Sequence, residues 1–177
     1  MERYKVRFTR LQQEIFRLFC VRTGKKLSQR KVAEYLLVSP TAIANSIPEL
    51  EKAGLIKRNK SSEMNLNLVE LNRDDQRTIQ LKKVENLKRL YESGLVNKLI
   101  EQYPGCTIVL FGSYAKGEDL FNSDIDFAVI GTKKKSSISK GLEKELRINT
   151  YQSWSKISKE LKESICNGIV LAGGIEL

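Results

Sequence analysis

The segment that most constrains this chain is residues 107–130, which read TIVLFGSYAKGEDLFNSDIDFAVI. Residues 107–111 form a short apolar run typical of a buried β-strand, and a glycine and a serine follow it at once. Ten further residues lead to an aspartate pair, D-I-D, at the head of a second apolar run. The segment therefore predicts two hydrophobic strands joined by a connection that carries polar groups at both ends.

The glycine and serine of this segment predict an anion site. Gly112 and Ser113 come directly after the first strand and precede a short helix expected over residues 114–117. Backbone N–H groups at such a turn have no partner within the helix, so they and the Ser113 hydroxyl are available to an anion. We expect a phosphate cradle at this turn.

The aspartate pair predicts a cation site. Asp124 and Asp126 are two residues apart, so on a strand their carboxylates share one face while Ile125, Phe127 and Val129 occupy the other. Two like charges this close repel each other unless a positive charge lies between them. Mg²⁺ meets that need, because it binds one or two carboxylates and completes its shell with water and phosphate oxygens.

Composition restricts the remaining chemistry. The chain has 177 residues, 41% of them hydrophobic, and no apolar run long enough to cross a bilayer, so we expect a soluble cytoplasmic protein without a membrane partner. The chain contains no histidine, which excludes imidazole bases and most zinc sites. Cys20, Cys106 and Cys166 are widely spaced, and we expect reduced, mostly buried thiols.

Positive charge is concentrated in the first part of the chain. Residues 1–72 contain 14 basic and 7 acidic residues, whereas residues 73–177 contain 17 and 14, so the net charges are +7 and +3. This asymmetry favours a polyanionic partner such as DNA for the first part.

The same part of the chain predicts three helices and a two-stranded hairpin. The helices are expected over residues 9–23, 28–37 and 39–54, and the strands over residues 55–58 and 64–71. The expected helix caps are Thr9, Ser28 and Ser39. The pattern LSQRKVAEYLLVSPTAIANSIPELEKAGLIKR resembles a winged helix-turn-helix.

A winged helix suggests two kinds of DNA contact. Thr41 and Asn45 of the third helix would face bases, together with Ser39, Ala42 and Ser46, and Asn45 is the best base reader among them. The expected phosphate contacts of the wing are Lys57, Arg58 and Lys60. The third helix lacks arginine, so a docking or homodimerisation module is the alternative.

A helix over residues 73–94 is expected to join two domains, residues 1–72 and residues 95–177. Asn72 is its expected cap, and its apolar face is expected to form core or a dimer interface. The residues of that face are Ile79, Val84, Leu87, Leu90 and Tyr91.

The residues LFGSYAKGEDLFNSDIDFAVIG resemble the minimal nucleotidyltransferase domains of the DNA polymerase β superfamily. With the winged helix included, the chain is similar to a group of archaeal proteins that join a winged helix to such a domain. The likeness extends from about residue 95 to the C-terminus, where SICNGIVLAGG resembles the domain's closing helix and strand. It implies an α+β fold whose second domain has a small mixed sheet flanked by helices.

The resemblance also implies an activity and a set of residues. The activity is transfer of a nucleoside monophosphate from a nucleoside triphosphate to an acceptor hydroxyl. Gly112 and Ser113 would hold the β- and γ-phosphates, Lys116 is an additional candidate for phosphate contact, and Asp124 and Asp126 would hold Mg²⁺.

One position departs from the pattern that the resemblance implies. The family's third carboxylate lies on the next strand, here expected over residues 147–151, where we expect Asn149 to occupy its place. Glu143 and Glu145 are expected on the helix before that strand. Two alternatives to an active enzyme follow: a DNA-binding regulator with an inactive transferase domain, and an antitoxin-like protein with a toxin as partner or acceptor.

Overall fold

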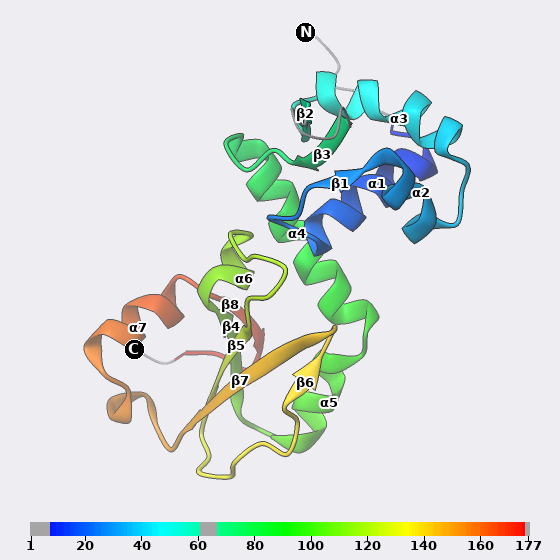
Figure 1. Ribbon diagram of the computed structural model, residues 1–177. Helices are drawn as coiled ribbons and strands as arrows, with labels where there is room; N and C mark the ends of the chain where they lie inside the picture. The colour runs from blue at the N-terminus through cyan, green and yellow to red at the C-terminus, as the bar shows by residue number, and fades with distance from the viewer. Residues whose placement is uncertain (1–7, 61–66, 176–177) are drawn as a thin grey trace, which may run out of the picture. The chain divides into compact units, whose positions relative to one another are not determined.

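The computed structural model describes residues 8–60 and 67–175, and the side chain of Lys60 lies outside the described part. The chain divides into two compact units, Met1–Thr78 and Ile79–Leu177. Figure 1 labels the helices and strands of both units.

The first unit has the topology of a winged helix-turn-helix. Its elements are α1 (Arg10–Val21), β1 (Leu27–Ser28), α2 (Gln29–Leu36), α3 (Pro40–Lys52), β2 (Ile56–Lys60) and β3 (Asn67–Leu71). The predicted caps are confirmed, because the hydroxyls of Thr9, Ser28 and Ser39 each accept a hydrogen bond of 3.2 Å from the backbone N–H three residues later. The three helices therefore begin where the sequence predicts.

The wing consists of β2 and β3, which pair antiparallel from Ile56↔Leu71 to Lys60↔Asn67. Within the described residues, β3 is the central strand, because β1 pairs with its other edge. The predicted turn of the hairpin, with the start of its second strand at Met64, lies outside the described residues.

Two side chains of the helix-turn-helix differ from expectation. The helical spacing of Val32, Ala33, Leu36 and Leu37 predicts that all four face inward. Leu37 is instead 93% exposed, because it caps α2 in the left-handed conformation at φ 55°. Ser46, expected to face DNA, is buried, and its hydroxyl donates to the Ala42 carbonyl at 2.8 Å. The exposed surface of α3 is therefore narrower than predicted.

The second unit is built on a mixed sheet. Its elements after α4 (Gln76–Glu92), which contains the boundary between the units, are α5 (Leu95–Gln102), β4 (Thr107–Phe111), α6 (Gly112–Lys116), β5 (Ile125–Ile130), β6 (Lys140–Gly141), β7 (Lys144–Tyr151), the short 3₁₀ helix η1 (Trp154–Lys156), α7 (Lys159–Cys166) and β8 (Ile169–Ala172). The described strands of this sheet follow the order β6-β7-β5-β4-β8. β5 and β7 are parallel, and the other neighbouring pairs are antiparallel.

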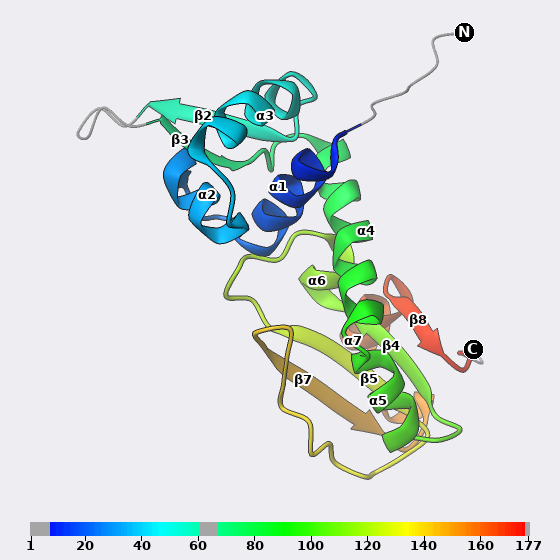
Figure 2. The same cartoon turned by 90° about the vertical axis from the view of Figure 1, so that its right-hand side faces the viewer.

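Helices cover both faces of this sheet (Figure 2). On one face, Ile108, Leu110 and Phe127 pack with apolar residues of α5 and with Tyr114 of α6. On the other face, Val109 and Ala128 pack with residues of η1 and α7. Alternate residues of each strand therefore enter different cores, which fixes the face that each polar side chain at a strand end occupies.

The predicted apolar face of α4 is only partly buried, because Leu90 lies in the core whereas two other members of the face are exposed. Val84 is 62% exposed and Tyr91 is 52% exposed. The buried positions recur at intervals of four residues and are mostly polar: Thr78, Lys82, Asn86 and Leu90. Hydrophobic spacing failed here because this face of α4 meets hydrogen-bonding partners rather than an apolar surface.

The predicted cap of α4 is wrong. The carboxylate of Asp75 accepts a hydrogen bond from the Thr78 backbone N–H at 3.1 Å, whereas the Asn72 side chain donates to the Gly54 carbonyl at 2.7 Å. α4 consequently begins at Gln76, later than predicted.

No disulfide links the three cysteines, all of them described, and only Cys20 is fully buried while Cys166 is exposed. Across residues 8–60 and 67–175, no helix combines the length and the hydropathy needed to cross a bilayer.

Candidate functional site

The glycine turn and the second aspartate lie directly against each other. Gly112 follows β4 and has φ +74°, a conformation that favours glycine. A Cβ atom placed on Gly112 would lie 2.5 Å from Oδ2 of Asp126, a distance too short for any side chain. The register Phe111↔Asp126 between β4 and β5 produces this approach. The predicted phosphate turn and the predicted metal ligand therefore form one site.

The other two predicted phosphate contacts, Ser113 and Lys116, lie on α6. Ser113 is half-buried in the first turn of α6, and its carbonyl accepts a hydrogen bond from the Glu118 N–H at 2.9 Å. Lys116 is exposed in the last turn of the same helix. α6 ends at Gly117, where the backbone of α4 leaves no room for a side chain.

An arginine, not an asparagine, lies beside the aspartate pair. β5 and β7 align Asp126 with Arg147, and the Arg147 guanidinium is 2.6 Å from Oδ2 of Asp124. Asn149, the predicted substitute for a third acid, pairs instead with Ala128, one step further from the site. In this register Asn149 lies two residues further along β7 than Arg147.

The expected helix before β7 is also corrected. Residues 131–143 are all described and form loops and the short strand β6 rather than a helix. Glu143 lies in the turn between β6 and β7 at φ 62°, and Glu145 lies on β7 itself. Strand alternation puts Glu145 on the same face as Arg147, while Leu146 points into the core. Glu145 is therefore a third acid on the strand that flanks the aspartate pair.

Asp126 lies in surroundings that disfavour its charge. Burial raises the pKa of the Asp126 carboxyl above its ordinary value, Arg147 acts against this, and the Asp124 carboxylate adds to it. Asp124 itself is 25% exposed and has the guanidinium as its partner. A further positive charge beside Asp126 would therefore stabilise the ionised form of its carboxyl.

A cavity of about 460 Å³ opens next to Asp124. Its lining includes Glu143 and Glu145 from the β6–β7 region and residues 121–123 from the connection that precedes Asp124. The exposed Lys140 also lines the cavity and pairs with Glu145 at 3.3 Å. A small polar group beside the aspartates would find both acceptors and a cation here.

The donor set of the site suits Mg²⁺ in its chemistry. Mg²⁺ binds hard oxygen ligands, commonly one or two carboxylates together with substrate phosphates, and Asp124 and Asp126 present such oxygens beside the Gly112 turn. Within residues 8–60 and 67–175, no three acidic or cysteine side chains are already gathered for a metal ion. The two aspartates would therefore hold the ion with oxygens supplied by a phosphate ligand.

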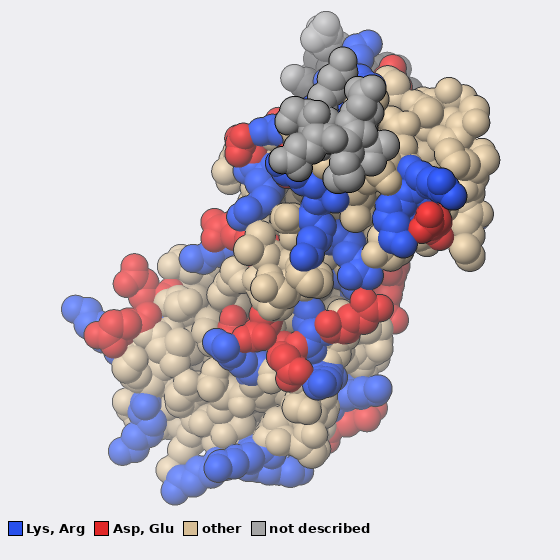
Figure 3. Space-filling view, viewed as in Figure 1, with Lys and Arg blue, Asp and Glu red and all other residues tan. Residues whose placement is uncertain are grey.

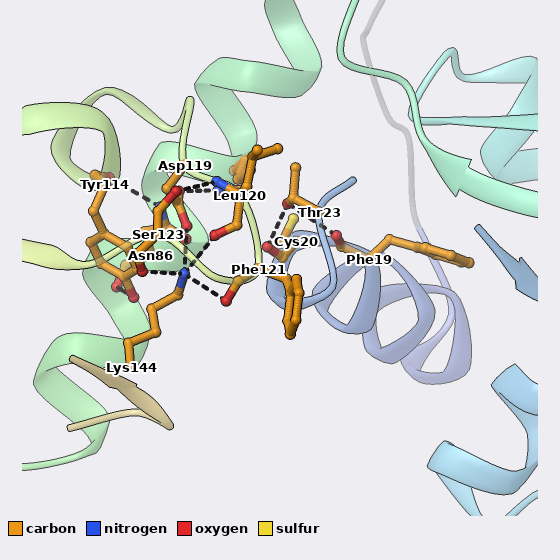
Figure 4. Close-up of polar contacts among 11 residues, drawn as sticks. Phe19, Cys20, Thr23, Asn86, Tyr114, Asp119, Leu120, Phe121, Ser123 and Lys144 are labelled. Carbon is orange, nitrogen blue, oxygen red and sulfur yellow. Dashed lines mark hydrogen bonds and ion pairs between the residues drawn. The ribbon is translucent and has the colours of Figure 1, made fainter. Parts of the chain in front are cut away.

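A buried polar network lies behind the site (Figure 4). Asp119, which is almost fully buried, pairs with Lys82 of α4 and, at 3.3 Å, with Lys144 of β7. Asn86 of α4 donates to the Asp119 carboxylate at 2.7 Å and to the Tyr114 carbonyl at 3.0 Å. The network joins α4, α6, β7 and the connection before Asp124, and its residues were not predicted as functional.

Lys144 links this network to the connection before Asp124. Its ammonium donates to the carbonyls of Leu120, Phe121 and Ser123 at 2.7, 3.2 and 3.1 Å. It also lies 5.8 Å from the centre of the Tyr114 ring. Burial lowers the pKa of Lys144 below its ordinary value, although the Asp119 carboxylate opposes this.

The predicted DNA-binding residues fall into two groups. Thr41 and Asn45 are exposed on α3. Lys57 and Arg58 of the wing pair within the unit, Lys57 with Asp74 and Arg58 with Glu51. Figure 3 likewise shows acidic side chains next to basic ones. The wing therefore presents less unpaired positive charge than the sequence predicts.

One part of the chain is similar to a known protein family. Residues 96–170 match the family model described as polymerase beta, nucleotidyltransferase. This part contains β4, β5 and β7 and therefore the whole candidate site. No curated protein matches the chain in sequence.

Similar solved structures include winged-helix regulators. The zinc-responsive MarR family member ZitR of Lactococcus lactis gives a TM-score of 0.41 at 19% identity, covering 57% of this chain and 67% of ZitR. The adhesin competence repressor AdcR of Streptococcus pyogenes gives a TM-score of 0.44 at 17% identity, covering 59% and 72%. At such low TM-scores these similarities carry no conclusion about the function of this chain.

Proposed function

We propose that the second unit is a Mg²⁺-dependent nucleotidyltransferase that moves a nucleoside monophosphate from a nucleoside triphosphate to an acceptor hydroxyl. The observation that carries this proposal is the contact between the Gly112 turn and the Asp126 carboxylate. A metal-bound triphosphate needs an anion site and a carboxylate site side by side, and this contact supplies both. The match of residues 96–170 to the nucleotidyltransferase model supports the same reading.

The residues have distinct roles in this proposal. The backbone N–H groups at Gly112 and Ser113 bind the β- and γ-phosphates, and Asp124 and Asp126 hold Mg²⁺. Glu145 is the third acid of the site, in place of Asn149. It lies on the same face of β7 as Arg147, and it lines the cavity next to Asp124. When bound, the ion neutralises the triphosphate and lowers the pKa of a coordinated hydroxyl.

In the proposed reaction the acceptor oxygen bonds to the α-phosphorus and the bond from that phosphorus to the bridging α,β oxygen breaks. Pyrophosphate leaves with the electron pair, and the acceptor proton passes to a carboxylate or to solvent. The chain contains no histidine, so carboxylates are the groups available for this proton at neutral pH. The acceptor is a hydroxyl of a protein or of a nucleic acid.

Isothermal titration calorimetry with Mg²⁺ and each common nucleoside triphosphate tests the binding step. We expect binding by the native protein and its loss in Asp124→Ala and Asp126→Ala, with folding checked by circular dichroism. Heats that do not change in these variants would refute the site. Incubation with labelled triphosphates and native cell extract then shows whether label is transferred to protein or to nucleic acid.

A second candidate function is a DNA-binding regulator whose transferase unit binds nucleotide without turnover. The ion pair between Arg147 and Asp124 favours it, because a guanidinium already neutralises one proposed metal ligand. In this reading the exposed Asn45 and Thr41 of α3 contact bases. Duplex affinity that falls steeply with salt, together with absent label transfer, would support it. Failure to retard any duplex at low salt would reject it.

A further inference from the structure

The first aspartate of the site stands at the end of an irregular segment. Residues 118–124 form no helix or strand, yet they connect α6 to β5 and end at Asp124. Within the segment, the Ser123 hydroxyl accepts a hydrogen bond from the Leu120 N–H at 2.9 Å, and the Ser123 N–H donates to the Leu120 carbonyl at 3.1 Å. These local bonds close one turn but do not attach that turn to the sheet.

The attachment to the sheet comes from Lys144. Its side chain is 4% exposed and reaches from the first residue of β7 to the carbonyls on both sides of the turn, those of Leu120 and Ser123. Figure 4 shows the ammonium among these oxygens, with Asp119 beside them. A lysine ammonium has three N–H donors, which is the number needed for the carbonyls of Leu120, Phe121 and Ser123.

We propose that Lys144 is a positioning residue that fixes Asp124 relative to Asp126 and the Gly112 turn. β7 pairs with β5, the strand that carries Asp126. The Lys144 ammonium therefore links the segment, through β7, to the strand of the second aspartate. Glu145 and Arg147 belong to the same strand and face the aspartates. Lys144 therefore ties the irregular segment to the strand that pairs with β5. The effect on nucleotide affinity rests on the proposed function, whereas the effect on the segment itself does not.

Lys82 provides a matched control for this proposal. Both lysines are buried and both pair with the Asp119 carboxylate. Lys144 in addition donates to the carbonyls of residues 120, 121 and 123. Replacing either lysine with methionine removes one buried charge and leaves Asp119 with the other lysine and Asn86. A difference between the variants therefore reports the bonds of Lys144 to these carbonyls rather than the loss of an ion pair with Asp119.

The first measurement is amide hydrogen exchange by mass spectrometry on the full chain. Lys144→Met should speed exchange in a peptide covering residues 118–126 by about tenfold, because segment opening exposes the bonded N–H groups of Leu120 and Ser123. Lys82→Met should change it by less than about twofold. A β4 peptide, residues 107–111, reports any global loosening. Equal exchange of residues 118–126 in the two variants would overturn the proposal.

The second measurement is the affinity for Mg²⁺ with non-hydrolysable analogues of the common nucleoside triphosphates. Lys144→Met should weaken it by about tenfold at unchanged fold, whereas Lys82→Met should leave it within about twofold. Equal affinities of the two variants would overturn a role in placing Asp124. If the native protein binds none of these ligands, the proposed function fails, and the exchange measurement alone decides whether Lys144 holds the segment.

Lys144→Gln decides the matter if Lys144→Met does not fold. Its amide keeps a polar group at this position, but it is shorter and has two N–H donors, so it cannot serve the carbonyls of Leu120, Phe121 and Ser123 together. Faster exchange of residues 118–126 with the β4 peptide unchanged would support the proposal, and unchanged exchange there would overturn it.

Discussion

The guanidinium of Arg147 lies 2.6 Å from Oδ2 of Asp124, so the protein itself places a positive charge on a carboxylate proposed to hold Mg²⁺. Arg147 is 69% exposed, and it extends from a strand whose register sets it opposite Asp126. A surface ion pair of this kind is weak, typically below about 1 kcal/mol, so a divalent ion can displace it. In the proposed site the arginine would therefore compete with Mg²⁺ for one ligand.

Replacing Arg147 with alanine should strengthen binding of Mg²⁺ alone. The competing cation is removed and the repulsion between the aspartates is left uncompensated, so we expect a gain of up to about fivefold, equivalent to about 1 kcal/mol. Calorimetric titration of the metal without nucleotide measures it. Arg147→Lys, which keeps a cation, is the control and should stay close to the native value. Weaker metal binding in the alanine variant would contradict this competition.

Asp126→Asn should stabilise the protein in the absence of metal. Burial raises the pKa of Asp126 in the folded state above the ordinary 3.8, so the folded protein disfavours the charged form. The folded state then retains the proton better than the unfolded state, and stability falls as pH rises from the ordinary pKa through the raised one. At pH 7 the variant escapes this penalty, and well below pH 3.8 the difference disappears.

Thermal unfolding followed by circular dichroism at several pH values tests this prediction. We expect the variant to melt higher than the native protein at neutral pH, and Mg²⁺ to stabilise only the native protein. A lower melting temperature of Asp126→Asn at neutral pH would show that the carboxylate is favourably bound without metal.

Gly112→Ala should cost more stability than Gly105→Ala. Both glycines have φ +74°, so alanine at either position pays a similar backbone strain of about 1 kcal/mol. Only at Gly112 does the new Cβ collide with the Asp126 carboxylate, whereas nothing lies within 4 Å at Gly105. The collision should add roughly 1–3 kcal/mol and disturb nucleotide binding. Urea unfolding of both variants measures the difference, and equal losses would contradict the close approach.

Glu51→Gln should increase non-specific affinity for duplex DNA if the wing meets phosphates. Glu51 accepts a hydrogen bond from Arg58 Nε at 2.6 Å, so its neutralisation releases the arginine toward a phosphate. We expect a severalfold gain and a steeper salt dependence, by about one phosphate contact, in gel-shift titrations. Glu101→Gln makes the same charge change on α5, in the other unit, and should have little effect. Equal gains in both variants would indicate net charge rather than the wing.

The sequence predicted well those features that depend on a few neighbouring residues. The caps at Ser28 and Ser39 and the turn after β4 follow from local hydrogen bonds and backbone preference, which nearby residues determine. The buried face of α4 could not be predicted in this way. Lys82 and Asn86 are buried because Asp119, more than thirty residues later, supplies their partner, and hydrophobic spacing carries no trace of such a pairing.

The position of Glu145 could be predicted only in part. Leu146 and Ile148 alternate with charged residues at period two, which is the signal of a strand and would have placed Glu145 on it. The sequence did not show the register between β5 and β7. Only the parallel pairing of β5 and β7 shows that Arg147 rather than Asn149 is aligned with Asp126.

The alternation along β7 also bears on how the chain reaches its native pairing. β5 and β7 are parallel strands joined by a connection of 13 residues, 131–143, so their register is not set by a tight turn. A shift of β7 by one residue would bury Glu145 and Arg147 in the core and expel Leu146. The charges of Glu145 and Arg147 thus disfavour misaligned strands during folding, and replacing them with apolar residues would remove that selection.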